Sequence, residues 1–199
     1  MPDDRPLDAR LAAKLVYPLR HSAITPNHLT TARLLFGASA CVLLSKGSYA
    51  YSNAGALCFV ISVFLDHADG ELARITGNKS KFGHYYDLIS DAISDILLFI
   101  GIGIGLMNSG LGTAALFMGI FAGVGVAATF HLRLLISDIT GQDQVEQPSI
   151  GLLEVEDVFY LLPLVTFFEL LQPFLIVAAV GAPVFALWTL RDYLRLKRS

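Results

Sequence analysis

The stretch DHADGELARITGNKSKFGHYYDLISDAISD, residues 66–95, holds six acidic residues between two long apolar regions. Asp66 and Asp69 are three residues apart, and Asp87 and Asp91 are four apart. On helices, both spacings put the two members of a pair on one face. A short loop in the middle of the stretch joins the two predicted helices, so we expect antiparallel neighbours. The two acidic pairs are therefore predicted to converge at one end of a helical bundle.

Four carboxylates in a partly dry cleft repel one another unless cations hold them. Hard divalent cations with oxygen ligands meet that need, and Mg²⁺ also keeps coordination positions open for substrate phosphates. Two such ions can activate an attacking oxygen and stabilise a leaving phosphate. The residues predict two Mg²⁺ ions, with Mn²⁺ as the alternative, held by Asp66, Asp69, Asp87 and Asp91. They also predict phosphoryl-type chemistry at a membrane surface.

The composition indicates a membrane protein. Of 199 residues, 54% are hydrophobic and 16% are charged, and the mean hydropathy is +0.60. An ordinary soluble domain has about 25% charged residues, so a water-soluble fold of this size would expose too much apolar surface. The net charge of −3 shows no basic excess, and no nucleic-acid partner is expected.

The apolar runs predict an all-α integral membrane protein with six transmembrane helices in one bundle. Two spans cover residues 29–45 and 49–65, two more lie within 96–130 on either side of Asn108-Ser109-Gly110, and the last two lie within 158–190, divided at Gln172-Pro173. The segment 1–22 mixes charged and apolar residues, which predicts an amphipathic helix along the membrane surface. Residues 23–199 would form the transmembrane domain.

Basic residues predict the orientation of the spans. If both termini are placed inside the cell, every Lys and Arg except Lys46 falls in a cytoplasmic segment or in the cytoplasmic end of a helix. Because positive residues favour the cytoplasmic side, we expect both termini and the acidic stretch to be cytoplasmic. The expected location is a bacterial inner membrane.

Three residues beside the aspartates fit binding of a nucleotide diphosphate. Gly70 follows Asp69 and would let a nucleotide approach the backbone closely. Arg74 lies about two helical turns after Asp66 and offers a fork of donors to a diphosphate. Gly83, one turn before Asp87, would permit close helix contact or substrate approach.

The acidic stretch resembles the signature of the CDP-alcohol phosphotransferases, class I. That signature reads D-x2-D-G-x2-A-R-x8-G-x3-D-x3-D, and it is met in full by Asp66, Asp69, Gly70, Ala73, Arg74, Gly83, Asp87 and Asp91. The predicted six-helix layout also agrees with that family. The resemblance implies phospholipid synthesis in which a phosphatidyl group moves from CDP-diacylglycerol, or another CDP-alcohol, to a small polar alcohol.

The resemblance also implies roles for individual residues. The first three aspartates would bind two metal ions, and Asp91 would take the proton from the acceptor hydroxyl, with a metal contact as a further role. CMP would then leave. Gly70, Arg74, Ser80 and Gly83 would contact the CDP part of the donor. In the segment ITPNHLTTAR, Asn27 and Thr30 would lie near the nucleotide, and a helix-capping role for Asn27 stands beside that interpretation.

The acceptor is less constrained. Phosphatidylglycerophosphate synthases usually carry a D-P-x-A-D-K pattern, whereas this chain reads DLISDA at residues 87–92, which disfavours that acceptor. The additional Asp95 resembles members that use inositol phosphate or similar polyols. Arg133 is an ionisable residue in the fourth span and a candidate for binding the acceptor. Its alternatives are a pair with Asp138 or an arginine that reaches for the interface.

Two other kinds of membrane protein also carry acidic residues of this sort. A membrane prenyltransferase also uses paired aspartates and a metal-bound diphosphate, but such chains are longer and have two separated acidic motifs. A divalent cation transporter would place its carboxylates near mid-membrane and would not benefit from Arg74 beside them. Gly119-x3-Gly123 predicts either helix packing or a dimer contact, and the family resemblance favours a homodimer.

Overall fold

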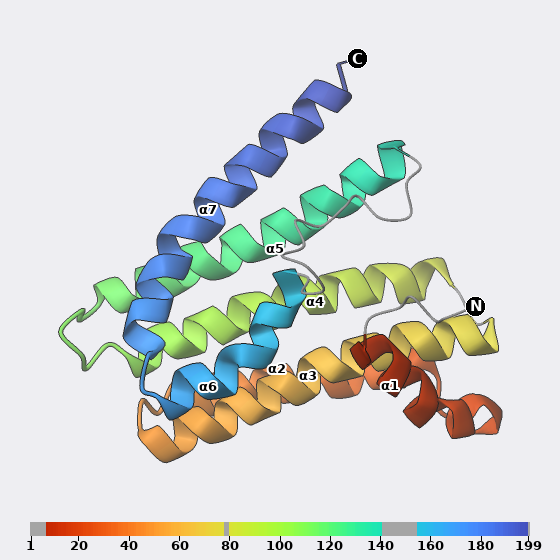
Figure 1. Cartoon of the computed structure of the whole chain (residues 1–199), viewed down its shortest axis with the longest axis horizontal. Helices are drawn as coiled ribbons and strands as arrows, with labels where there is room; N and C mark the ends of the chain where they lie inside the picture. The colour runs from red at the N-terminus through yellow and green to blue at the C-terminus, as the bar shows by residue number, and fades with distance from the viewer. Residues whose placement is uncertain (1–6, 78–79, 141–154, 199) are drawn as a thin grey trace.

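The fold was examined in a computed structural model that describes residues 7–77, 80–140 and 155–198 (Figure 1). Those residues form helices joined by short links, with no strand among them. The α-helices are α1 (Leu7–Val16), α2 (Pro26–Leu44), α3 (Tyr49–Thr76), α4 (Lys81–Gly105), α5 (Ala114–Thr140), α6 (Leu162–Phe167) and α7 (Leu171–Leu196). Two 3-10 helices, η1 (Tyr17–His21) and η2 (Val155–Leu161), precede α2 and α6. The all-α class predicted from the sequence is confirmed.

The long helices run alongside one another, and successive helices reverse direction (Figure 1). The end of α3 and the beginning of α4 lie at the same end of the molecule as α1. The turn between α2 and α3 and the link between α4 and α5 lie at the opposite end. The stretch 66–95 therefore brings its two helical parts to one end, as the sequence predicts.

Local sequence explains where the helices around this end begin and stop. Thr25 precedes α2, where its backbone N–H donates to Nδ1 of His28 at 3.2 Å and Pro26 occupies the first turn. α3 stops at Gly77, which has φ of 66° and so adopts the left-handed conformation that suits glycine. α4 begins after Ser80, whose Oγ accepts a hydrogen bond from the Gly83 backbone N–H at 2.9 Å.

The packing of α3 and α4 differs from the sequence-based expectation. We expected antiparallel neighbours, and the two helices do run in opposite directions (Figure 1), but α2 lies between them and packs extensively against each. In the described part of the chain, α3 and α4 share at most a marginal backbone contact. A short link fixes the direction of two consecutive helices but does not exclude a third helix from the space between them. The aspartates of α3 and α4 therefore come together beside α2, which contacts both helices.

Glycines allow α2, α4 and α5 to approach closely. A Cβ on Gly101 of α4 would lie 2.7 Å from the Cys41 carbonyl oxygen of α2, and one on Gly123 of α5 would lie 2.8 Å from Ile96 Cα. Gly119 faces the Phe99 backbone of α4 in the same way. Of the two interpretations of Gly119-x3-Gly123, packing within the chain is confirmed, because both glycines are buried against α4.

Three helices, α4, α5 and α7, are long and apolar enough to cross a membrane by length and composition among the described residues. The expected division between the fifth and sixth spans is displaced. α7 begins at Leu171 and contains Pro173 in its first turn, where proline is tolerated. The chain instead reverses at residues 168–170, where Glu169 has φ of 57°.

The N-terminal helix α1 packs against the C-terminal part of α3. Ala12 and Val16 are buried in a small hydrophobic cluster with Ala68 and Leu72 of α3. Leu11, by contrast, is exposed. The predicted amphipathic segment 1–22 includes residues 1–6, which lie outside the described residues.

Candidate active site

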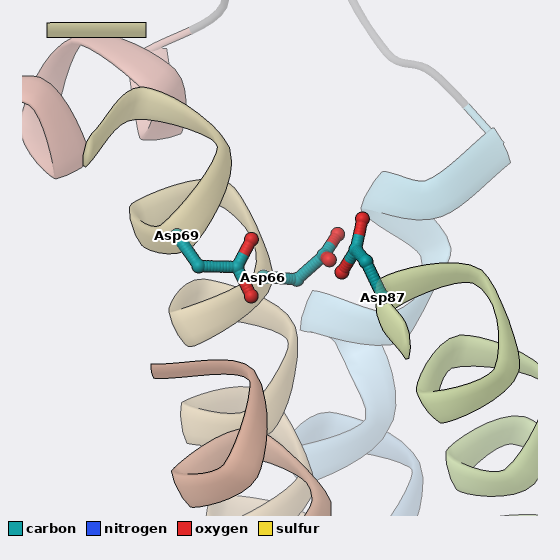
Figure 2. Close-up of side chains that lie close together, drawn as sticks. All are labelled: Asp66, Asp69 and Asp87. Atoms are coloured by element: carbon teal, nitrogen blue, oxygen red, sulfur yellow. The ribbon is translucent and has the colours of Figure 1, made fainter. Parts of the chain in front are cut away.

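Three of the predicted metal ligands form one cluster. Asp66 and Asp69 on α3 and Asp87 on α4 each offer a carboxylate oxygen, and these atoms lie within 4.8 Å of one another. Figure 2 shows the Asp66 and Asp87 side chains pointing toward each other from their two helices, with Asp69 beside Asp66. The i, i+3 spacing on α3 produces this arrangement because it places both α3 carboxylates on one face.

α2 orients the most buried member of this cluster. The Thr30 hydroxyl donates a 2.7 Å hydrogen bond to Asp69 Oδ2, and both residues are buried. The hydrogen bond holds the Asp69 carboxylate in place and occupies its Oδ2 atom. Sequence reasoning placed Thr30 near the nucleotide, whereas the structure places its side chain against an aspartate.

A second residue of α2, Arg33, contacts the remaining aspartates. Its Nη1 pairs with Asp66 Oδ1 and lies 2.7 Å from Asp91 Oδ1 and 3.3 Å from Asp87 Oδ1. Its Nη2 donates to the Asp87 backbone carbonyl at 3.0 Å. The fourth signature aspartate, Asp91, is thus joined to the cluster through Arg33.

Sequence reasoning missed the role of Arg33. The signal available was one arginine within an apolar span, a residue class that is costly in a membrane and commonly functional there. Thr30 and Arg33 are three residues apart on α2, so one helix face carries both donors to the aspartates.

The donor chemistry of the cluster fits a divalent cation. The ligand atoms are carboxylate oxygens, which Mg²⁺ prefers. Asp87 Oδ1 is buried and accepts no hydrogen bond from the described residues. The Asp66, Asp87 and Asp91 side chains nevertheless retain 30%, 38% and 43% of their accessible surface. Asp87 therefore has a buried oxygen without a hydrogen-bond donor, and the side chains of Asp66, Asp87 and Asp91 remain partly exposed.

The two predicted diphosphate-binding residues of α3 are exposed. Gly70 has no atom within 4 Å of the position that a Cβ would occupy, which leaves its backbone open to a ligand. The Arg74 side chain is 59% exposed, and its Nη1 donates to Glu71 Oε1 at 2.5 Å. Glu71 is itself buried, so a fixed carboxylate restrains an otherwise mobile arginine. Glu71 carried no sequence-based prediction.

Three further residues that were predicted to contact the CDP-linked substrate lie together where α2 and α4 begin. A Cβ on Gly83 would lie 3.0 Å from Ser80 Oγ and 3.1 Å from Asn27 Oδ1. The three residues are therefore neighbours, although α2 and α4 contribute them from distant parts of the sequence. Ser80 serves as the cap of α4 and is an exposed residue.

Arg133 lies elsewhere in the fold. It is half-buried on α5, and its guanidinium carbon lies 5.1 Å from the centroid of the Phe185 ring on α7. This is a cation–π distance and positions the side chain between α5 and α7. Asp95, one turn beyond Asp91 on α4, is buried in the bundle.

Part of the chain is similar in sequence to known proteins. The chain is 39% identical over 84 residues to an archaetidylinositol phosphate synthase of Pyrococcus horikoshii, covering 41% of this chain and 42% of that protein. It is 30% identical over 128 residues to a CDP-diacylglycerol–serine O-phosphatidyltransferase of Helicobacter pylori, covering 61% and 51%. The chain thus spans about half the length of these curated relatives.

A solved structure has the same fold. It is the Mycobacterium tuberculosis phosphatidylinositol phosphate synthase with CDP-DAG bound, which is 19% identical, with a TM-score of 0.62, 95% of this chain and 92% of that chain covered. The model of the CDP-alcohol phosphatidyltransferase family matches residues 23–190, which include the aspartate cluster and nearly all of the helices. The chain therefore belongs to the CDP-alcohol phosphatidyltransferase family.

Proposed function

We propose that this protein is a membrane enzyme that transfers a phosphatidyl group from CDP-diacylglycerol to the hydroxyl of a small polar alcohol and releases CMP. The observation that carries the proposal is the convergence of Asp66, Asp69 and Asp87, within a chain that the family match covers from residue 23 to 190. The family and the relatives name this chemistry, and the cluster supplies residues suited to it.

Asp66, Asp69, Asp87 and Asp91 would hold two Mg²⁺ ions. Bound there, the ions would neutralise charge on the donor diphosphate as the phosphorus–oxygen bond breaks. The carboxylates would orient those ions because Thr30 and Arg33 fix one side of the cluster. Mn²⁺ offers similar oxygen preferences and is the alternative ion.

Asp91 is our candidate for the general base. Arg33 engages its Oδ1, and the side chain keeps 43% of its surface exposed, so a carboxylate oxygen remains available to an acceptor hydroxyl. The acceptor oxygen would form a bond to the lipid-bearing phosphorus while its proton passes to Asp91. The bond from that phosphorus to the bridging oxygen would break, and this oxygen would leave as part of CMP.

The donor would lie along the exposed beginning of α4 and end of α3. Gly70 leaves space for a close approach to the backbone, and Arg74 presents a restrained guanidinium for the diphosphate. The neighbouring Asn27, Ser80 and Gly83 would contact the nucleotide. CDP-DAG in the solved relative supports CDP-diacylglycerol as the donor class.

For the acceptor, we place a phosphorylated polyol such as inositol phosphate first, then glycerol phosphate, then serine or an amino alcohol. Two of the similar proteins are named as inositol phosphate lipid synthases and one as a serine transferase. Arg133 would bind an acceptor phosphate or carboxylate as a forked donor.

The membrane arrangement follows from the apolar helices. We propose six crossings, with α2, α3 and the η2–α6 segment joining the three helices that are apolar enough on their own. α1 would lie on the cytoplasmic surface, since it exposes Leu11 and Leu15 beside the end of α3. Both termini and the site would be cytoplasmic, and the enzyme would act as a homodimer.

The test is CMP release by the purified protein in detergent, with CDP-diacylglycerol, Mg²⁺ and each acceptor in turn. We expect release that depends on one acceptor and is lost in Asp91→Asn. If CMP is released only from another CDP-linked donor, that donor and not CDP-diacylglycerol is the substrate. Failure of the folded protein to bind CDP at all would overturn the proposed function.

A further inference from the structure

Among the residues whose burial is described, Arg33 is the largest side chain that is completely buried. It is 1% exposed and lies on α2, the helix between α3 and α4. A buried guanidinium is costly unless charged or hydrogen-bonding partners compensate it. Arg33 therefore needs charged partners inside the bundle.

Its partners come from both sides of the site. Asp66 belongs to α3, whereas Asp87 and Asp91 belong to α4, and one nitrogen, Nη1, lies within ion-pair distance of all three. Since α3 and α4 have at most a marginal backbone contact in the described chain, this guanidinium is a physical link between their carboxylates.

Arg33 and its three partners differ in how far they are exposed to solvent. The Arg33 side chain is 2% exposed, whereas its three partners retain between 30% and 43% of their side-chain surface. Arg33 thus occupies the interior side of the cluster, and it uses Oδ1 of each aspartate. Thr30, on the same helix, takes one oxygen of Asp69. All four signature aspartates are therefore contacted by a side chain of α2.

We propose that Arg33 is the resident counter-charge of the aspartate cluster, a positioning residue that holds three signature aspartates together whether or not divalent ions are bound. It offsets one of the four negative charges, so ions are still attracted. The proposal rests on the proposed function only in taking divalent ions as the ligands of the cluster.

Because Arg33 and the ions neutralise the same carboxylates, each should matter less to stability when the other is present. Loss of Arg33 should destabilise the metal-free protein most, because the carboxylates then repel one another. Added Mg²⁺ should restore part of that loss. An arginine that merely fills space would cost the same stability with and without Mg²⁺.

The first test is thermal unfolding in detergent with EDTA. Arg33→Met removes the charge and keeps an unbranched side chain, and we expect its apparent melting temperature to fall by about 10 °C, as for a broken buried ion pair. Arg33→Lys keeps the charge and should lose less. Lys46→Met, in the exposed turn between α2 and α3, removes a positive charge far from the site and should change little.

The decisive variant is Arg33→Met combined with Asp91→Asn. Removing one negative charge should relieve the repulsion, so the double variant should melt above Arg33→Met alone. Additive losses would overturn the proposal. If Arg33→Met cannot be purified folded, recovery of the folded double variant supports the proposal, and failure to recover it contradicts it.

The second test is the shift in melting temperature on adding Mg²⁺. We expect a larger rise for Arg33→Met than for the wild type, and an equal or smaller rise would overturn the proposal. Neither test uses catalysis. If the double variant melts above Arg33→Met but the wild type releases no CMP, the role of Arg33 stands and the proposed function is rejected. If the wild type releases CMP but the double variant does not melt above Arg33→Met, the proposed function stands and the role of Arg33 is rejected.

Discussion

The Thr30 hydroxyl on α2 donates a 2.7 Å hydrogen bond to Asp69 Oδ2 on α3 in a buried contact. It fixes a predicted metal ligand from a neighbouring helix. We expect Thr30→Val, which preserves the shape but removes the donor, to raise the Mg²⁺ concentration needed for half-maximal activity by about 10- to 100-fold, as for other supports of metal ligands. A Mg²⁺ titration of CMP release measures this.

Thr30→Ser is the matched control, because it keeps the hydroxyl. Its Mg²⁺ dependence should stay near that of the wild type. If the valine and serine variants shift equally, the lost methyl packing rather than the hydrogen bond explains the effect.

Removal of divalent ions should abolish activity while leaving the helices folded. EDTA should stop CMP release, and excess Mg²⁺ should restore it. Asp66→Asn should lower kcat by at least about 100-fold, the loss typical of removing one charge-stabilising group. Circular dichroism in EDTA checks the fold. Activity that survives exhaustive chelation would contradict a metal-dependent reaction.

Gly70 allows a donor-binding role to be separated from a structural one. Nothing lies within 4 Å of a Cβ at this position, and alanine is favoured over glycine in a helix by about 1 kcal/mol. Gly70→Ala should therefore fold at least as stably as the wild type. If the nucleotide approaches the backbone here, KM for CDP-diacylglycerol should rise. An unchanged KM would remove Gly70 from the donor site.

Gly123 should matter for packing within the chain. A Cβ there would lie 2.8 Å from Ile96 Cα, so α5 would have to move away from α4. We expect Gly123→Ala to lose about 1–3 kcal/mol of stability, as in overpacked cores. Gly110→Ala, which meets nothing within 4 Å, is the control. Melting temperatures that fall equally for both variants would contradict the packing account.

The sequence predicted the aspartate cluster well because helical spacing is regular. Asp66 and Asp69 share a face of α3, and the reversal at Gly77 returns the chain so that Asp87 comes within reach. The position of α2 was not predictable in this way. A hydropathy pattern identifies a helix but not which two helices it separates, so the roles of Thr30 and Arg33 required the fold.

The break before α7 shows a different limit. Proline at residue 173 indicated a helix end, yet proline is compatible with a first turn, and the reversal came at residues 168–170 instead. Arg133 was recognisable as an ionisable residue in an apolar span. Its partner, the Phe185 ring on α7, depended on helix packing that the sequence pattern does not encode.

Transfer of the phosphatidyl group to an alcohol is tested most directly by the mass of the lipid that the purified protein forms from CDP-diacylglycerol and inositol phosphate with Mg²⁺. We predict a lipid that joins the phosphatidyl group to the acceptor, formed in equal amount to CMP and absent with Asp91→Asn. CMP formed together with phosphatidic acid, and no joined product with any alcohol, would show hydrolysis and contradict transfer.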